Sequence, residues 1–259
     1  MSKLKILGNS IYFGFLAIIL YGCYHDYFTW CSTIYSICFA SFLRFVFLPA
    51  DCDMILQYYE YFGKNVDSLN GEVIWITGAS SGIGEALALT LAKGKVKLAL
   101  SARSEDLLHK VKERCIEIGN LDSEDVLVVP LDMTDYDKHE SAFSTVLKHF
   151  GKVSSANRSA YGPQRAQWER IETSVDEALF YVNTFGLLRL ARRATLHFVS
   201  VGGGSHVVMS SVAGRMGVPM SASYTGSKHA LMVSFLCFFF VCVCGGVVGT
   251  NMCVCVCNI

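Results

Sequence analysis

Hydrophobic residues are unevenly distributed along the 259-residue chain. Two uncharged apolar runs, residues 6–24 and 27–43, lie near the N-terminus, and a third apolar stretch closes the sequence. Between these ends, short apolar runs rich in β-branched residues alternate with segments of helical character. Strands that alternate with helices are typical of an α/β fold, so we expect a Rossmann-like, doubly wound parallel sheet over residues 71–235.

The predicted elements of this central region follow one another at short intervals. Strands are expected at residues 72–77, 96–103, 125–132 and 205–211. Helices are expected at residues 85–94, 104–119 and 135–150. The first strand, EVIWIT, is largely apolar, which is the pattern of a parallel strand buried on both faces.

The two N-terminal runs predict a membrane anchor at residues 1–50, followed by a linker at residues 51–70. A spanning helix needs roughly 20 apolar residues, and each run is close to that length. Lys3 and Lys5 precede the first run, as in a signal anchor. One spanning helix and a hairpin of two helices both fit. A buried core helix is the weaker alternative because the runs show little amphipathic period.

The charge of the chain is balanced, with 22 basic and 22 acidic residues. Nucleic acid is therefore not an expected partner, because phosphate binding needs a surplus of Lys and Arg. Cys115 is the single cysteine of the central region, which argues against a disulfide framework there. The Cys-x-Cys pairs near the C-terminus lack the accompanying His or Cys pairs of zinc sites, so no metal site is expected.

The stretch TGASSGIG directly follows the first strand. Its glycines permit a tight turn and a close approach of the backbone to a pyrophosphate, and the next helix presents free N–H groups. An ordinary turn is the alternative, but the order of strand, glycine loop and helix favours a dinucleotide site. The cofactor-binding residues assigned to this stretch are Thr77, Gly78, Ser80, Ser81, Gly82, Ile83 and Gly84.

The end of the second strand, from Ser101 to Arg103, contains no acidic residue. NAD-binding sheets place a carboxylate there for the ribose 2′-hydroxyl, whereas an arginine suits the 2′-phosphate of NADP. Arg103 therefore predicts NADP(H) as the cofactor, with a solvated surface arginine as the alternative.

Tyr224 and Lys228 are four residues apart, and both follow Ser211. At this spacing the two side chains share one helix face, and an ammonium beside a phenol favours the phenolate. Such a tyrosine can exchange a proton with a carbonyl oxygen that the Ser211 hydroxyl also contacts. The Tyr-x-x-x-Lys spacing often arises by chance, but the glycine loop upstream makes the chemical interpretation the stronger one.

These segments together resemble the short-chain dehydrogenase/reductase family over roughly residues 71–235, and within it a membrane-anchored group. The segments that carry the resemblance are TGASSGIG, LDMTD at residues 131–135, VNTFG at 182–186, SSVAG at 210–214 and YTGSK at 224–228.

The resemblance implies a role for five residues. Tyr224 would be the general acid/base, Lys228 its partner and a ligand of the nicotinamide ribose, and Ser211 would polarise the substrate carbonyl. Asn183 would hold a water molecule of a proton relay, and Asp132 would bond the adenine amino group. The alternatives are a structural hydrogen bond for Asn183 and a loop cap for Asp132.

The resemblance also implies a substrate, a partner and a location. The substrate would be a small hydrophobic carbonyl/alcohol pair of the steroid or retinoid kind. The protein would reside in the endoplasmic reticulum membrane. It would form a homodimer through the helices that carry Asn183 and Tyr224.

Two segments depart from the pattern of the family. Residues 153–163 are polar where a central apolar strand is expected, and residues 236–259 form a Val/Cys tail in place of a sixth strand. Translated non-coding sequence would explain the tail, with a C-terminal membrane segment as the alternative, and a short out-of-frame reading would explain the polar stretch. We therefore expect a C-terminally incomplete sheet. A catalytically incompetent, membrane-tethered remnant is the alternative function.

Overall fold

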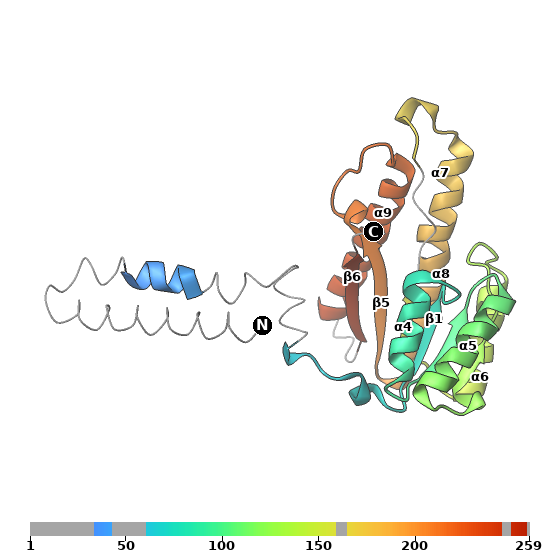
Figure 1. The fold of residues 1–259 in the computed structure, drawn as a ribbon. Coiled ribbons are helices and arrows are strands. Elements are labelled where there is room, and N and C mark those ends of the chain that lie inside the picture. Colours follow the sequence, from blue (N-terminus) through green and yellow to red (C-terminus); the bar gives the residue numbers. More distant parts are fainter. Residues whose placement is uncertain (1–33, 43–60, 159–164, 245–249, 258–259) are drawn as a thin grey trace, which may run out of the picture. The chain divides into compact units, whose positions relative to one another are not determined.

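The computed structural model describes residues 34–42, 61–158, 165–244 and 250–257 (Figure 1). The chain divides into two compact units, Met1–Lys64 and Asn65–Ile259. In the first unit residues 34–42 are helical, and most of the predicted anchor lies outside the described residues. No helix within the described ranges is long and apolar enough to cross a membrane.

The second unit is built on a parallel sheet of six strands (Figure 1). Their order is β3-β2-β1-β4-β5-β6, and every neighbouring pair is parallel. The chain leaves one half of the sheet after β3 and enters the other at β4, which is the doubly wound arrangement. The strands are β1 (Val73–Thr77), β2 (Lys97–Ser101), β3 (Val126–Val128), β4 (Ser155–Arg158), β5 (Gly204–Ser211) and β6 (Thr250–Cys257).

The connections between the strands are helical, as the sequence predicts. The α-helices are α4 (Gly82–Ala92), α5 (Glu105–Gly119), α6 (Lys138–Phe150), α7 (Thr173–Phe180), α8 (Gly186–Val201) and α9 (Ala222–Cys244). A π-helical turn, η4 (Tyr181–Phe185), joins α7 to α8. The short 3-10 helices are η1 (Val66–Leu69), η2 (Ser123–Asp125), η3 (Trp168–Arg170) and η5 (Val212–Gly214).

Apolar side chains on both faces of the sheet hold the helices in two layers. Ile74 and Ile76 of β1 pack with residues of α4 and α5. Trp75, between them, points to the opposite face and packs with residues of α6 and α8, because successive side chains of a strand alternate. Its indole N–H donates to the Ser101 hydroxyl at 2.8 Å, so this buried polar atom is satisfied.

The polar segment found where the family has an apolar central strand supplies the fourth strand of the sheet. Residues 155–158 form β4 between β1 and β5, and residues 159–164 lie outside the described ranges. The first part of this stretch therefore forms a central strand although its residues are not apolar. Pairing on both sides satisfies the backbone N–H and C=O groups whatever the side chains are.

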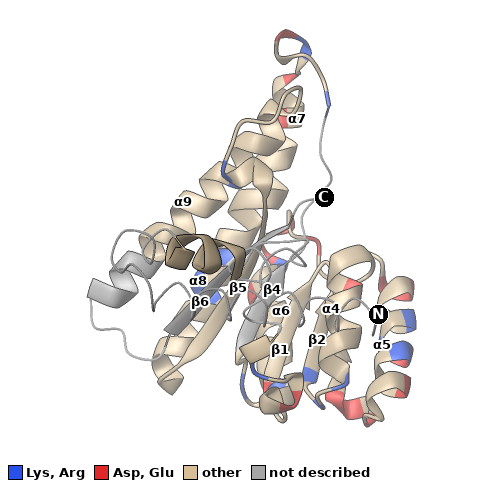
Figure 2. Ribbon diagram, turned by 60° about the vertical axis from the view of Figure 1, so that its left-hand side comes forward, with Lys and Arg blue, Asp and Glu red and all other residues tan. Residues whose placement is uncertain are grey.

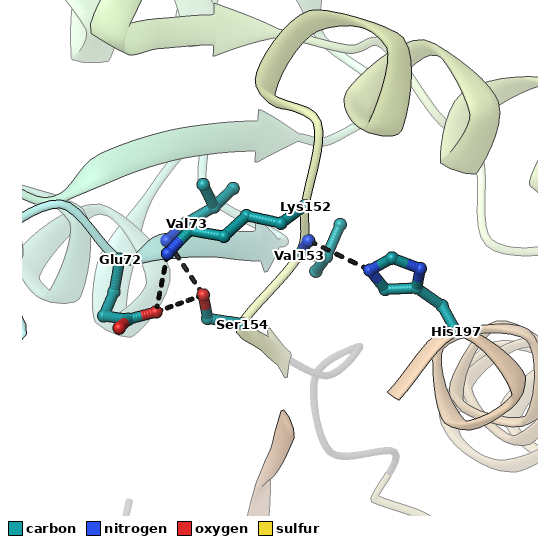
Figure 3. Close-up of polar contacts among 6 residues, drawn as sticks. All are labelled: Glu72, Val73, Lys152, Val153, Ser154 and His197. Carbon is teal, nitrogen blue, oxygen red and sulfur yellow. Dashed lines mark hydrogen bonds and ion pairs between the residues drawn. The ribbon is translucent and has the colours of Figure 1, made fainter. Parts of the chain in front are cut away.

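A polar cluster fixes the entry to β4 (Figure 3). Ser154 donates its hydroxyl hydrogen to Glu72 and its N–H to the carbonyl of Val73 at 2.8 Å. The Lys152 ammonium lies 3.4 Å from the same carboxylate. The hydrogen bond from Ser154, assisted by Lys152, holds the pKa of Glu72 below its ordinary value. These contacts align the start of β4 with the start of β1.

The C-terminal tail also contributes to the sheet. Thr250–Cys257 forms β6, which pairs with β5 from Gly204 to Ser211. The expectation of a sheet without a sixth strand therefore does not hold. The open edge of β5 offers unpaired backbone groups, and alternating valine favours the extended backbone that can pair with them.

Candidate active site

The glycine loop occupies the carboxyl end of β1, at the point where the winding of the sheet reverses. Gly78 has a φ of 72°, a left-handed conformation that favours glycine. Its N–H and that of Ala79 both donate to the Ser101 carbonyl, at 2.7 and 3.1 Å. The loop is thereby tied to the end of β2. Gly82, which opens α4, has a φ of 59° and is strained for any other residue.

Gly84 lets α4 lie directly on this loop. A Cβ at this position would overlap the carbonyl oxygen of Gly78, so no side chain fits. The Ser81 side chain makes no capping hydrogen bond at the start of α4. N–H groups in the first turn of a helix that lack a side-chain cap suit a phosphate. The close backbone packing and the uncapped helix start therefore fit a dinucleotide pyrophosphate.

The other predicted loop residues differ in how far their side chains are buried. Thr77 is the last residue of β1 and is buried. Ser80 and Ile83 are half-buried, and Ser81 is exposed. The turn therefore presents a polar, solvent-accessible rim above a buried strand end.

Arg103 and Asp132 both lie beyond the carboxyl ends of their strands. Arg103 is exposed two residues after β2. One oxygen of Asp132, Oδ1, accepts hydrogen bonds from the backbone N–H and the hydroxyl of Thr134 at 2.9 and 2.8 Å. The Leu131 N–H donates to the carbonyl of Ala102 at 3.0 Å and joins the two segments. Asp132 thus caps its own turn through Oδ1, and its contact with the adenine amino group stays a prediction.

Tyr224 and Lys228 lie one turn apart near the start of α9, as their spacing predicts. The Lys228 Nζ is 5.7 Å from the centre of the Tyr224 ring. Lys228 is 1% exposed and Tyr224 is 6% exposed, so both residues are almost fully buried. The ammonium also donates to the Met209 carbonyl of β5 at 3.0 Å. This hydrogen bond fixes the lysine between the sheet and the tyrosine.

Ser211 is the last residue of β5 and reaches the same region. Its hydroxyl oxygen accepts the N–H of Ala213 at 3.2 Å. Ala213 in turn packs with the Tyr224 ring and with Leu179 of α7. Because Ser211 accepts through its oxygen in this bond, its hydroxyl hydrogen can be directed to a substrate oxygen.

Asn183 is completely buried in the π-turn η4, and its side chain faces α9. Its amide Nδ2 donates to the Ser227 hydroxyl at 3.3 Å. Ser227 donates to the Tyr224 carbonyl at 2.8 Å and accepts the Thr184 hydroxyl at its own carbonyl at 3.0 Å. The asparagine is therefore bonded to α9, the helix that carries Tyr224 and Lys228, and its predicted role in holding a water molecule stays a prediction.

Ser227 was not among the residues predicted from the sequence. The signal that could have found it is its place directly before Lys228 and three residues after Tyr224, which puts it on a neighbouring helix face. The Met209 carbonyl was also not predicted. Because every residue has a backbone carbonyl, the residue type does not indicate which carbonyl accepts a hydrogen bond.

Gly186 connects this group to the nucleotide side of the sheet. A Cβ there would overlap the carbonyl oxygen of Met133. The first residue of α8 therefore packs on the turn that contains Asp132. The structure places Lys228 beside the Tyr224 ring, links Asn183 to their helix through Ser227, and brings Ser211 next to Tyr224 through Ala213.

Known proteins resemble this chain in sequence and in fold. The model of the family described as short chain dehydrogenase matches residues 72–236. The mouse protein named dehydrogenase/reductase SDR family member 7 is 41% identical over 71% of this chain and 55% of its own length. A Xenopus tropicalis protein named hydroxysteroid 11-beta-dehydrogenase 1-like protein is 32% identical over 64% and 56%, respectively. The chain thus spans about half the length of these relatives.

A solved structure shows the same fold. The crystal structure of NAD⁺-bound xylitol dehydrogenase superposes with a TM-score of 0.61 at 24% identity. The superposition covers 71% of this chain and 68% of that protein.

Proposed function

Because the chain belongs to the short-chain dehydrogenase family, we propose that it is an oxidoreductase that uses NADP(H) to interconvert a hydrophobic carbonyl compound and its alcohol. The observation that carries this proposal is the buried Lys228 ammonium, 5.7 Å from the Tyr224 ring and bonded to the end region of β5. A buried ammonium beside a phenol is suited to proton transfer.

The glycine loop is the part of the site that fits a nicotinamide dinucleotide. Gly78, Gly82 and Gly84 would hold the pyrophosphate on the start of α4. Arg103, exposed beyond β2, would pair with a 2′-phosphate, which supports NADP(H) over NAD(H). When bound, the nicotinamide would supply or accept the hydride.

The residues of this chain would handle the proton. Tyr224 gives its hydroxyl proton to the carbonyl oxygen in the reduction and removes it in the oxidation. Lys228, held against β5 by its hydrogen bond to Met209, places its ammonium beside the Tyr224 ring. Ser211 donates to the same substrate oxygen and orients it. Asn183 holds the helix of Tyr224 through Ser227, and a water on this asparagine would return the proton.

The substrate class, location and assembly rest on the family likeness. Relatives include a protein named as hydroxysteroid dehydrogenase-like, which supports a steroid-like or retinoid-like carbonyl/alcohol pair for this chain. The apolar N-terminal runs support attachment to the endoplasmic reticulum membrane. Exposed Tyr181 and Phe185 on η4 support a homodimer through this helical face.

A second function is favoured by one observation. The strand β4 lies at the centre of the sheet beside the glycine loop, and its sequence, SANR, is polar. If the end of this strand does not support the bound cofactor, the chain would be a catalytically incompetent, membrane-tethered protein.

A cofactor titration separates the two functions. The full chain, solubilised in mild detergent, is titrated with NADPH and with NADH while nicotinamide fluorescence is followed. Enhanced fluorescence with NADPH at lower concentration than with NADH supports the enzyme, and NADPH consumption with a steroid or retinoid carbonyl then tests turnover. Absence of any fluorescence change at millimolar NADPH would support the catalytically incompetent protein instead.

A further inference from the structure

Ser101, the last residue of β2, bonds to β1 through its side chain and to the glycine loop through its backbone. Its hydroxyl oxygen accepts the Trp75 indole N–H at 2.8 Å. Its carbonyl accepts the N–H groups of Gly78 and Ala79 at 2.7 and 3.1 Å. One residue therefore joins the interior of the sheet to the turn that would hold a pyrophosphate.

The Trp75 side chain reaches Ser101 diagonally across the two strands. The residue directly opposite Trp75 on β2 is Ala99, and Ser101 lies opposite Thr77. Residues two apart on a strand share a face, so Ala99 and Ser101 both lie on the face to which Trp75 points. A side chain as small as that of alanine leaves room for the indole to extend toward Ser101.

The hydrogen bond between Trp75 and Ser101 lies in apolar surroundings. Trp75 is 0% exposed and Ser101 is 1% exposed. Phe143 of α6 packs on the indole, with the ring centres 5.9 Å apart. Figure 2 shows β1 and β2 side by side, with charged residues on the surrounding helices and at the ends of the strands. Loss of the Ser101 hydroxyl would leave the indole N–H buried without an acceptor, so the end of β2 would have to shift.

The backbone beyond Ser101 is held by a separate bond. The Ala102 carbonyl accepts the Leu131 N–H at 3.0 Å, and the exposed Arg103 follows. This bond holds the backbone before Arg103 independently of Trp75. A shift of Ser101 should therefore act on the glycine loop, which binds directly to its carbonyl, more than on Arg103.

We propose that Trp75 and Ser101 form a positioning pair for the cofactor. Their hydrogen bond fixes the Ser101 carbonyl where it holds the glycine loop in the conformation that binds a dinucleotide. Both side chains are buried, so neither would touch the cofactor itself. The inference rests on the oxidoreductase function proposed above and adds to it two residues outside the glycine loop.

Ser101→Ala in the full chain, solubilised in mild detergent, tests the pair because it removes the hydroxyl and keeps the carbonyl. We expect NADPH and NADH each to bind about tenfold more weakly, since both contain the pyrophosphate. The KM for NADPH should rise by the same factor, whereas kcat at saturating cofactor should stay within about twofold of wild type. Val146→Ala, at a fully buried residue of α6 in the same apolar cluster, is the matched control. It should lower stability and leave both cofactor affinities unchanged.

A double-mutant cycle separates the hydrogen bond from packing. Trp75→Phe removes the indole N–H and keeps an aromatic ring. In this background Ser101→Ala should weaken cofactor binding by less than about twofold, because the hydroxyl no longer has its donor. Three outcomes would overturn the proposal: full additivity of the two losses, unchanged cofactor affinity in Ser101→Ala, and an equal loss of affinity in Val146→Ala.

Amide hydrogen exchange tests the pair without cofactor. In Ser101→Ala the peptide that contains Gly78 and Ala79 should exchange at least about tenfold faster than in wild type, and in Val146→Ala it should not. If wild type binds neither cofactor, the proposed function fails, and hydrogen exchange still decides the role of the pair. If wild type binds NADPH but exchange at residues 78–79 is unchanged in Ser101→Ala, the positioning pair alone is refuted.

Discussion

The Asn183 amide donates to the Ser227 hydroxyl across 3.3 Å, and this bond joins the π-turn η4 to the helix that carries Tyr224 and Lys228. Ser227 also donates to the Tyr224 carbonyl. A change at either end of this pair should therefore move the proton-transfer group relative to the rest of the site.

We predict that Ser227→Ala lowers kcat about tenfold, because the loss of its hydrogen bonds should shift Tyr224. The affinity for NADPH should stay within about twofold of wild type, because Ser227 lies on α9 and not on the glycine loop that would hold the pyrophosphate. The free energy of unfolding should fall by about 1 kcal/mol for the lost buried bond. Steady-state kinetics and denaturation measure both quantities.

Ser141→Ala is the matched control for Ser227→Ala. Ser141 donates its hydroxyl hydrogen to the carbonyl of Lys138, three residues back, so this bond lies within α6. Its removal should leave kcat unchanged. In a double-mutant cycle, Asn183→Ala should add little to Ser227→Ala, and full additivity would show that the two side chains act independently.

Tyr224→Phe should abolish most turnover while NADPH still binds. The substitution removes the hydroxyl that transfers the proton and keeps the ring that packs with Leu179 and Ala213. General acid/base groups contribute about 100-fold to 10,000-fold, so a loss in this range is expected in NADPH consumption. Tyr181→Phe, at an exposed tyrosine of η4, is the control. Full turnover by the Tyr224 variant would exclude it as the acid.

Arg103→Gln should weaken NADPH binding by about tenfold and leave NADH binding unchanged. The guanidinium is expected to pair with the 2′-phosphate, which NADH lacks. Fluorescence titration with both cofactors measures the ratio of the two affinities. Lys110→Gln, which removes an exposed positive charge from the adjoining α5, should not change that ratio. An equal loss for both cofactors would assign Arg103 a role outside cofactor selection.

His206 should make the fold sensitive to acid. Burial among aromatic rings lowers the pKa of His206 from 6.5 to about 4. Between these values the unfolded chain binds a proton that the folded chain does not, so the free energy of unfolding falls as the pH falls. The loss is about 3 kcal/mol at most. Denaturation at pH 7 and at pH 4.5 measures it.

The matched variants for this prediction are His206→Phe and His109→Gln. The first variant removes the titrating group and should make stability less dependent on pH. Part of the pH dependence should remain, because burial also lowers the pKa of His139 and His197. His109 is an exposed histidine on α5, and its loss should change nothing. An unchanged slope in His206→Phe would show that other groups control acid unfolding.

The first half of the sheet and the catalytic spacing were predictable because their signals are local. The apolar run of β1, the glycines of the next turn and the four-residue interval from Tyr224 to Lys228 each act through neighbours in sequence. The strands β2 and β3 are shorter than predicted, since only residues paired with a neighbouring strand count as part of each strand. The site residues on these elements therefore lie where the sequence places them.

Polar and low-complexity segments were harder to interpret. Residues 155–158 lack the apolar pattern of a central strand, and no sixth strand was expected in the tail, yet residues 155–158 and 250–257 both pair with β5 through backbone atoms. Backbone pairing at an unpaired strand edge needs no particular side chain, so the pattern carried no information about it.

By itself the sequence determined the alternation of strand and helix, the glycine loop and the shared helix face of Tyr224 and Lys228. Only the tertiary structure decided that Asn183 bonds to Ser227, that Lys228 bonds to the carbonyl of Met209, and that the Trp75 indole bonds to the Ser101 hydroxyl. These contacts join residues distant in the chain, or involve backbone atoms that every residue shares. Their formation depends on how the packed layers bring helices and strands together, which periodicity and spacing do not record.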